Sequence, residues 1–198
     1  QPRGKQSEEF YSHGCDYTRT TGIWQTVWIE QVADTYISNS KIRTADLSGI
    51  INCDISVVGD ITDTELQLTA YYDGEEVGTA VADVMCNTVN ISMALNEAHL
   101  WEVGNGRLYN LKYELVKGGE VIDTANGYFG LRTVSLNKNA ICINGKVVFQ
   151  RLVLDQGFYP DGIYTAKTVE DIYHDIDMSM ELGFNGARPH EKVFEEHY

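Results

Sequence analysis

The sequence predicts a mainly β protein: an immunoglobulin-like β-sandwich preceded by a single strand and followed by a strand–helix–strand segment. Three observations predict this class. Between Tyr36 and Leu136, about seven short runs alternate apolar and polar residues, with turn signals about every 8–14 residues. Residues 22–32 alternate with apolar side chains on both faces. After Leu136 the pattern changes to a strand, a helix and a second strand.

The sandwich is predicted from its alternating runs, in which every second residue is apolar, as in a sheet with one buried face. The predicted core residues are Ile51, Cys53, Ile55, Val57, Leu66, Leu68, Ala70, Tyr72, Val89, Ile91, Met93, Leu95, Tyr109, Leu111, Tyr113 and Leu115. Hairpin turns are predicted at Asp73-Gly74, Lys117-Gly118-Gly119 and Asn144-Gly145. No Trp lies between Cys53 and Cys86, so the Cys–Trp–Cys spacing of antibody domains is absent and sandwich architecture alone is predicted.

The amino-terminal segment reads as irregular structure over residues 1–21, followed by one strand over residues 22–32 that is covered on both sides. That strand has no partner within residues 1–34, so we expect its sheet to lie elsewhere in a longer protein. Trp24 and Trp28 have two interpretations. They form a sugar-stacking platform, or, as we favour, they pack between domains.

The carboxy-terminal segment predicts one βαβ unit. The helix is expected over residues 168–182, capped by Thr168 with Asp171 three residues on and ended by Gly183. Its apolar stripe contains Ile172, Ile176 and Met180, flanked by Tyr173, Met178 and Leu182. One such unit cannot close a sheet, so it either packs on the sandwich or begins a (β/α)8 barrel that is cut short.

Composition narrows the classes of partner. The net charge of −14 disfavours nucleic acid and anionic membranes, and no apolar run is long enough to span a bilayer. The four cysteines are scattered without a C-x-x-C pair, so we expect free thiols and no metal or other cofactor. The histidines His13, His99, His174 and His197 show no ligand spacing. The compartment, cytoplasmic or periplasmic, is left open.

Four segments carry a family resemblance: YTRTTGIWQTVWIE from Tyr17, HLWEVGNGRLYNLKYEL from His99, GYFGLRTVSLNKNAICINGKVVFQRLVLDQGFYP from Gly127, and LGFNGARPHEKVFEE from Leu182. In this order they resemble family 2 glycoside hydrolases, the β-galactosidase-like group. The first is similar to the end of that family's sugar-binding jelly-roll domain, and the second to its late sandwich signature. The third is similar to the junction that leads into the first barrel strand, and the last resembles the second barrel strand.

The resemblance implies three pieces: the tail of a jelly-roll domain over residues 1–34, a complete sandwich over 35–136, and a truncated start of a TIM barrel over 137–198. It also implies retaining hydrolysis of β-glycosides by two glutamates on later barrel strands, which this chain lacks, so the chain alone is expected to be inactive. Asn96-Glu97 has the same two residue types as the family's catalytic Asn-Glu dipeptide but lies in the sandwich region, and we interpret it as a surface turn. The alternative is a standalone immunoglobulin-like binding module.

Four residues are predicted to bind substrate in the intact enzyme, and no catalytic residue is assigned. Arg188 and His190 follow the second barrel-like strand, and Asp155 and Gln156 end the first. Active sites of barrels are built at these strand ends. Arg188 is expected to hold a carboxylate or sugar hydroxyl, and His190 and Asp155 hydroxyls, with solvated strand ends as the alternative.

Departures from the family pattern leave the sugar open, with a β-galactoside as the default. Where the β-galactosidases usually carry Arg-Gly…His-Glu, this chain reads RLVLDQG from Arg151. The acidic residues Glu191, Glu195 and Glu196 read as a solvated face. We also expect self-association through the apolar faces of Trp24, Trp28 and the helix, unless they fold onto the sandwich.

Overall fold

The computed structural model describes residues 6–194 apart from residues 12 and 192. Contacts within the chain divide it into two compact units, one formed by Glu30–Phe149 and the other by Gln1–Ile29 with Gln150–Tyr198. Glu195, Glu196 and His197, named in the sequence analysis, lie outside the described residues.

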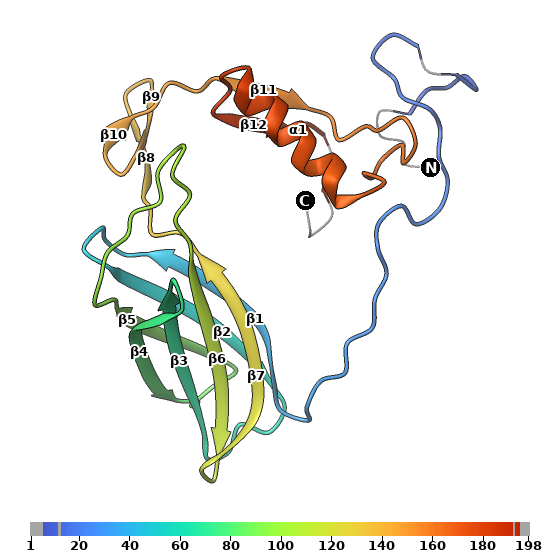
Figure 1. Cartoon of the computed structure of the whole chain (residues 1–198). Coiled ribbons are helices and arrows are strands. Elements are labelled where there is room, and N and C mark those ends of the chain that lie inside the picture. Colours follow the sequence, from blue (N-terminus) through green and yellow to red (C-terminus); the bar gives the residue numbers. More distant parts are fainter. Residues whose placement is uncertain (1–5, 12, 192, 195–198) are drawn as a thin grey trace. The chain divides into compact units, whose positions relative to one another are not determined.

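The first unit is a β-sandwich of two antiparallel sheets with strand orders β1-β2-β5 and β4-β3-β6-β7 (Figure 1). Its seven strands are β1 (Tyr36–Thr44), β2 (Ile50–Val58), β3 (Thr64–Tyr72), β4 (Glu75–Asp83), β5 (Thr88–Ala94), β6 (Tyr109–Lys117) and β7 (Glu120–Phe129). The prediction of about seven strands without an intervening helix is confirmed.

The core lies between the two sheets. Of the sixteen predicted core residues, all but Tyr72 are buried, and Tyr72 is half-buried against the ring of Tyr109. Strand β6 contributes the largest side chains, Tyr109 and Tyr113, because its alternate residues point inward along its whole length. The outer face of the other sheet is polar. There the Arg43 guanidinium pairs with Asp54, whose Oδ1 also accepts from Asn90 at 2.7 Å.

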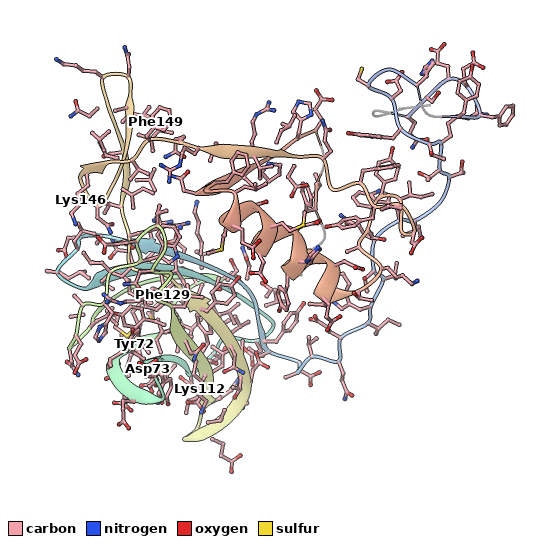
Figure 2. All side chains as sticks on the ribbon, turned by 45° about the horizontal axis from the view of Figure 1, so that its top comes forward. Tyr72, Asp73, Lys112, Phe129, Lys146 and Phe149 are labelled. Carbon is pink, nitrogen blue, oxygen red and sulfur yellow. The ribbon has the colours of Figure 1, made fainter. Side chains whose placement is uncertain are left out.

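The three predicted hairpin turns are confirmed, and each uses left-handed backbone. Asp73 and Gly74 have φ angles of 49° and 89°, and Gly118 and Gly119 have 61° and 84°. Positive φ at both central positions lets a two-residue loop follow the right-handed twist of the strands. Figure 2 shows Asp73 in the turn that joins β3 to β4.

A small three-stranded sheet, ordered β10-β9-β8, follows the sandwich within the same unit. It contains β8 (Val134–Asn137), β9 (Ala140–Ile143) and β10 (Lys146–Val147), and Lys146 lies just after its second turn (Figure 2). In that turn the Asn144 side chain donates to the Trp101 carbonyl (2.9 Å) and accepts from the Thr133 backbone N–H (3.0 Å). One side chain therefore ties the turn to the loop between β5 and β6.

The second unit contains a βαβ arrangement, as predicted. Strands β11 (Leu152–Asp155) and β12 (Gly186–Pro189) pair in parallel, and helix α1 (Val169–Glu181) connects them. Thr168 and Asp171 form a complete capping box. At the other end, Gly183 has φ 83°, its N–H donates to Met180 O, and the Phe184 N–H donates to Ser179 O. This is a Schellman ending, so both predicted helix signals are confirmed.

One expectation for the amino-terminal segment is wrong. Residues 22–32 form no strand, and Ile23, Val27 and Ile29 are 72–98% exposed. A strand is stabilised by ladder hydrogen bonds to a neighbour, and this segment pairs with no strand of the described chain. The apolar stripe of α1 is buried only at Ile172, while its other five residues are exposed. Burial of that stripe by self-association remains a prediction.

Candidate functional site

The candidate site lies at the carboxyl edge of the β11-β12 pair. Parallel pairing sets Leu154 opposite Arg188 and Asp155 opposite Pro189, so both strands end at the same level. The His190 N–H continues the ladder to the Asp155 carbonyl at 2.9 Å. The four predicted site residues, Asp155, Gln156, Arg188 and His190, are thereby gathered along one edge.

The opposite edge explains this register. The Asn185 N–H donates to the Arg151 carbonyl, and Asn185 Oδ1 accepts from the Arg151 N–H, both at 2.9 Å. The Arg151 side chain also donates from Nε to the Gly183 carbonyl at 2.8 Å, which holds the end of the helix over the same edge. These bonds align the two strands before their polar ends are reached. Arg151 therefore has a structural place in this fold.

Asp155 and Gln156 are half-buried at the end of β11. The Asp155 carboxylate accepts a hydrogen bond from the Gly157 N–H at 2.7 Å, which orients it at the start of the following loop. Carboxylate oxygens accept hydrogen bonds from hydroxyl groups, which is the chemistry that a sugar requires.

Arg188 and His190 differ in their surroundings. Arg188 is exposed on β12, where its guanidinium offers a planar set of donors. His190 is mostly buried, with 18% of its side chain exposed, and its Nε2 lies 3.7 Å from Glu191 Oε1. Its Nδ1 is buried and has no hydrogen-bond partner among the described residues. Buried polar atoms are nearly always paired, so this nitrogen is suited to an added hydrogen-bonding group.

The loop after β11 is tightly held. Tyr159 and Ile163 exchange reciprocal backbone hydrogen bonds at 2.9 and 3.0 Å across Pro160, Asp161 and Gly162. Ile163 has φ 60°, which is unusual for a β-branched residue. Burial and then the neighbouring Asp175 carboxylate raise the pKa of Tyr159 above its ordinary value.

An aromatic cluster, missed in the sequence analysis except for Trp24, adjoins this loop. We use the name aromatic cluster for Tyr17, Trp24, Phe158 and Tyr164. Tyr17 stacks on Phe158 with centroids 4.5 Å apart, and Trp24 packs against Tyr164 at 5.8 Å. No local pattern signals these pairs, because their members lie more than a hundred residues apart in the chain. The predicted partner Trp28 lies outside the cluster and is 58% exposed.

The remaining sequence candidates lie apart from this edge. Asn96-Glu97 forms a bend between β5 and β6, where the Glu97 carboxylate contacts His99 Nε2 at 2.9 Å. The four cysteines are unpaired, with Cys53 and Cys142 buried and the other two exposed. Among the described residues, no group of three or more His, Cys, Asp or Glu side chains is arranged to hold a metal ion. None of the helices described is both long and apolar enough to cross a bilayer.

The architecture thus combines a β-sandwich with a parallel βαβ unit that ends in polar residues, and sequence comparison identifies the family. The family described as "Glycosyl hydrolases family 2" matches residues 31–132, slightly more than half of the chain. The chain belongs to glycosyl hydrolase family 2.

Individual relatives agree with this assignment. A β-galactosidase from Lactococcus lactis is 26% identical over 92% of the chain, and one from Priestia megaterium is 25% identical over 91%. Among solved structures, a β-glucuronidase from Bifidobacterium dentium has a TM-score of 0.75 at 23% identity, and one from Ruminococcus gnavus 0.71 at 17%; each match covers 83% of the chain. The chain spans 18% and 19% of the two curated relatives, and 28% and 27% of the two solved chains.

Proposed function

We propose that this chain is part of a retaining β-glycosidase that hydrolyses O-glycosidic bonds in carbohydrates, and that its carboxy-terminal polar edge contributes to the substrate pocket. The observation that carries the proposal is the gathering of Asp155, Gln156, Arg188 and His190 at the carboxyl ends of two parallel strands. In barrel enzymes that edge is where substrates bind.

The domain assignment is part of the same proposal. Residues 1–34 are the tail of a jelly-roll domain, residues 35–136 the immunoglobulin-like sandwich, and residues 137–198 the start of a (β/α)8 barrel. The parallel β11-α1-β12 unit supports the barrel, because each repeat of that fold consists of a parallel strand followed by a helix. The exposed apolar stripe of α1 also fits a helix that packs against further elements.

Each site residue has a proposed role in the intact enzyme. The Asp155 carboxylate and Gln156 amide bind hydroxyl groups of the sugar, and His190 Nδ1 pairs with another hydroxyl. Arg188 binds either a hydroxyl or a sugar carboxylate, because guanidinium matches a carboxylate with two parallel hydrogen bonds. The default substrate is a β-galactoside. A β-glucuronide is the second candidate, since Arg188 can bind its carboxylate. The two catalytic glutamates are expected outside this chain, which alone turns nothing over.

The test compares this 198-residue chain with the complete polypeptide encoded by its gene, on p-nitrophenyl β-galactoside and p-nitrophenyl β-glucuronide. The complete polypeptide is expected to hydrolyse one of them and the short chain neither. In the active enzyme, Arg188→Ala is expected to raise KM at least tenfold for a glucuronide and less for a galactoside. Lys167→Ala serves as the control, because Lys167 is an exposed cation of the same unit that pairs with Asp161. Hydrolysis by the short chain, or none by the complete one, refutes the proposal.

A further inference from the structure

The aromatic cluster joins two parts of the chain that are distant in sequence. Tyr17 and Trp24 belong to the amino-terminal segment, and Phe158 and Tyr164 flank the loop after β11. Tyr17 and Phe158 are nearly parallel, with an interplanar angle of 16°, and Phe158 meets Tyr164 edge-on at 86°. The loop that follows Asp155 and Gln156 is therefore bordered by four rings.

Hydrogen bonds restrain the backbone of both segments that carry these rings. The Ser7 N–H donates to the Tyr17 carbonyl at 2.7 Å, so Tyr17 is anchored within its own segment. The reciprocal bonds between Tyr159 and Ile163 hold the segment that separates Phe158 from Tyr164. Rings on restrained backbone present a surface with little conformational entropy left to lose on binding.

Two of the four rings remain open to solvent. Trp24 is 40% exposed and Phe158 is 36% exposed, while Tyr17 and Tyr164 are half-buried and support them. The face of an aromatic ring carries partial negative charge, so it attracts the partly positive hydrogen atoms of a neighbouring ring. Phe158 follows Gln156 by two residues, and Trp24 packs against Tyr164 at the far end of the same loop, so both partly exposed rings border the loop that leaves the polar strand end.

We propose that the aromatic cluster is the subsite for the leaving group of the glycoside, and that Trp24 and Phe158 contact its flat ring. The inference rests on the proposed function, in which Asp155 and Gln156 bind the hydroxyl-rich sugar whose bond is cleaved. The ring on the other side of that bond is then bound by the neighbouring aromatic side chains. The ring is either an aromatic aglycone or a second pyranose, since both present a flat apolar face.

The experiment uses the complete enzyme with Trp24→Ala and Phe158→Ala. Three substrates share one cleaved sugar and differ in the leaving group: p-nitrophenyl, a second sugar, or methyl. Trp28→Ala is the matched control, because Trp28 is a solvent-exposed tryptophan of the same segment outside the cluster. Trp24→Phe keeps an aromatic face and should restore most of the wild-type behaviour.

We expect KM to rise about three- to tenfold for the ring-bearing leaving groups and less than twofold for the methyl glycoside. An effect on the aryl substrate alone assigns an aromatic aglycone, and an effect on the disaccharide alone assigns a sugar. Equal changes for all three substrates, or changes no larger than those of Trp28→Ala, overturn the proposal, because a merely structural cluster would act on every substrate alike.

A binding measurement separates this inference from the proposed function. If the wild-type enzyme hydrolyses none of the three substrates with either galactose or glucuronic acid as the cleaved sugar, the proposed function fails. Saturation-transfer NMR with p-nitrophenyl β-galactoside then decides the subsite. Stronger transfer to the aryl protons in the wild type than in Phe158→Ala supports an aromatic-binding surface, and equal transfer overturns it.

Discussion

Replacing Tyr109 by Phe tests a fully buried core side chain of the sandwich that is hydrogen-bonded to the backbone. Its ring is fully buried and stacks on Phe129 at 4.9 Å, and its hydroxyl makes two hydrogen bonds. The hydroxyl donates to the Glu97 carbonyl at 2.9 Å and accepts from the His99 N–H at 2.6 Å. Phenylalanine keeps the ring and removes only the oxygen, so the loss isolates the two hydrogen bonds.

The expected loss is about 1–3 kcal/mol in the free energy of unfolding, because a backbone donor and acceptor are left without their partner. With a urea slope of about 1.5 kcal/mol per molar, the midpoint should fall by about 0.7–2 M. Urea titration followed by Trp101 fluorescence reports the sandwich once Trp24 and Trp28 are replaced by Phe. Tyr128→Phe, at a position 70% exposed, is the control. A midpoint shift no larger than that of the control refutes the reasoning.

Two further predictions concern pH and the small sheet. Burial raises the pKa of the Cys53 thiol to about 11 from 9.0, so the native state keeps this proton longer than the unfolded state does. The contribution of this thiol to the free energy of unfolding should be constant below pH 9 and should fall between pH 9 and pH 11. In Cys53→Ala that part of the fall should be absent. Parallel pH curves for the wild-type chain and the variant would contradict the prediction. Asn144→Ala should lower the free energy of unfolding by about 1–3 kcal/mol and speed exchange of the Thr133 amide, because both side-chain bonds are lost. Asn139→Ala, in the other turn of that sheet, should change the free energy of unfolding little. If Asn139→Ala and Asn144→Ala lower it equally, the hydrogen bond from Asn144 to Trp101 is not the cause.

The elements of the sandwich could be predicted because their signals are local. Alternation along β2 and β6 identifies the buried face of each strand without knowledge of its neighbours. Turn pairs such as Asp73-Gly74 and the Thr168 capping box act within a few residues. The order of the strand ends also allowed Asp155 and Arg188 to be placed at one edge, since parallel pairing follows from a βαβ unit.

The one failed element, the strand over residues 22–32, has a different cause. Residues 22–32 alternate as a strand does, yet a strand needs a partner to satisfy its backbone, and the described chain provides none for them. The stripe on α1 has the period of a buried helix face, but burial depends on what packs against it. Periodicity states which residues can share a face, and it does not state whether that face is covered.

By itself the sequence determined the strands and turns of the sandwich, the helix limits and the family resemblance, because each depends on residue type and spacing over a short stretch. Only the tertiary structure decided that Asn144 bonds to Trp101, that His190 Nδ1 is buried with no hydrogen-bond partner in the described part of the chain, and that Tyr17 stacks on Phe158. These contacts join residues that are distant in the sequence, so they stabilise the protein only after the intervening chain has folded. The local pattern therefore predicts which polar residues belong to the candidate site, and the packing of distant segments determines which side chains surround them.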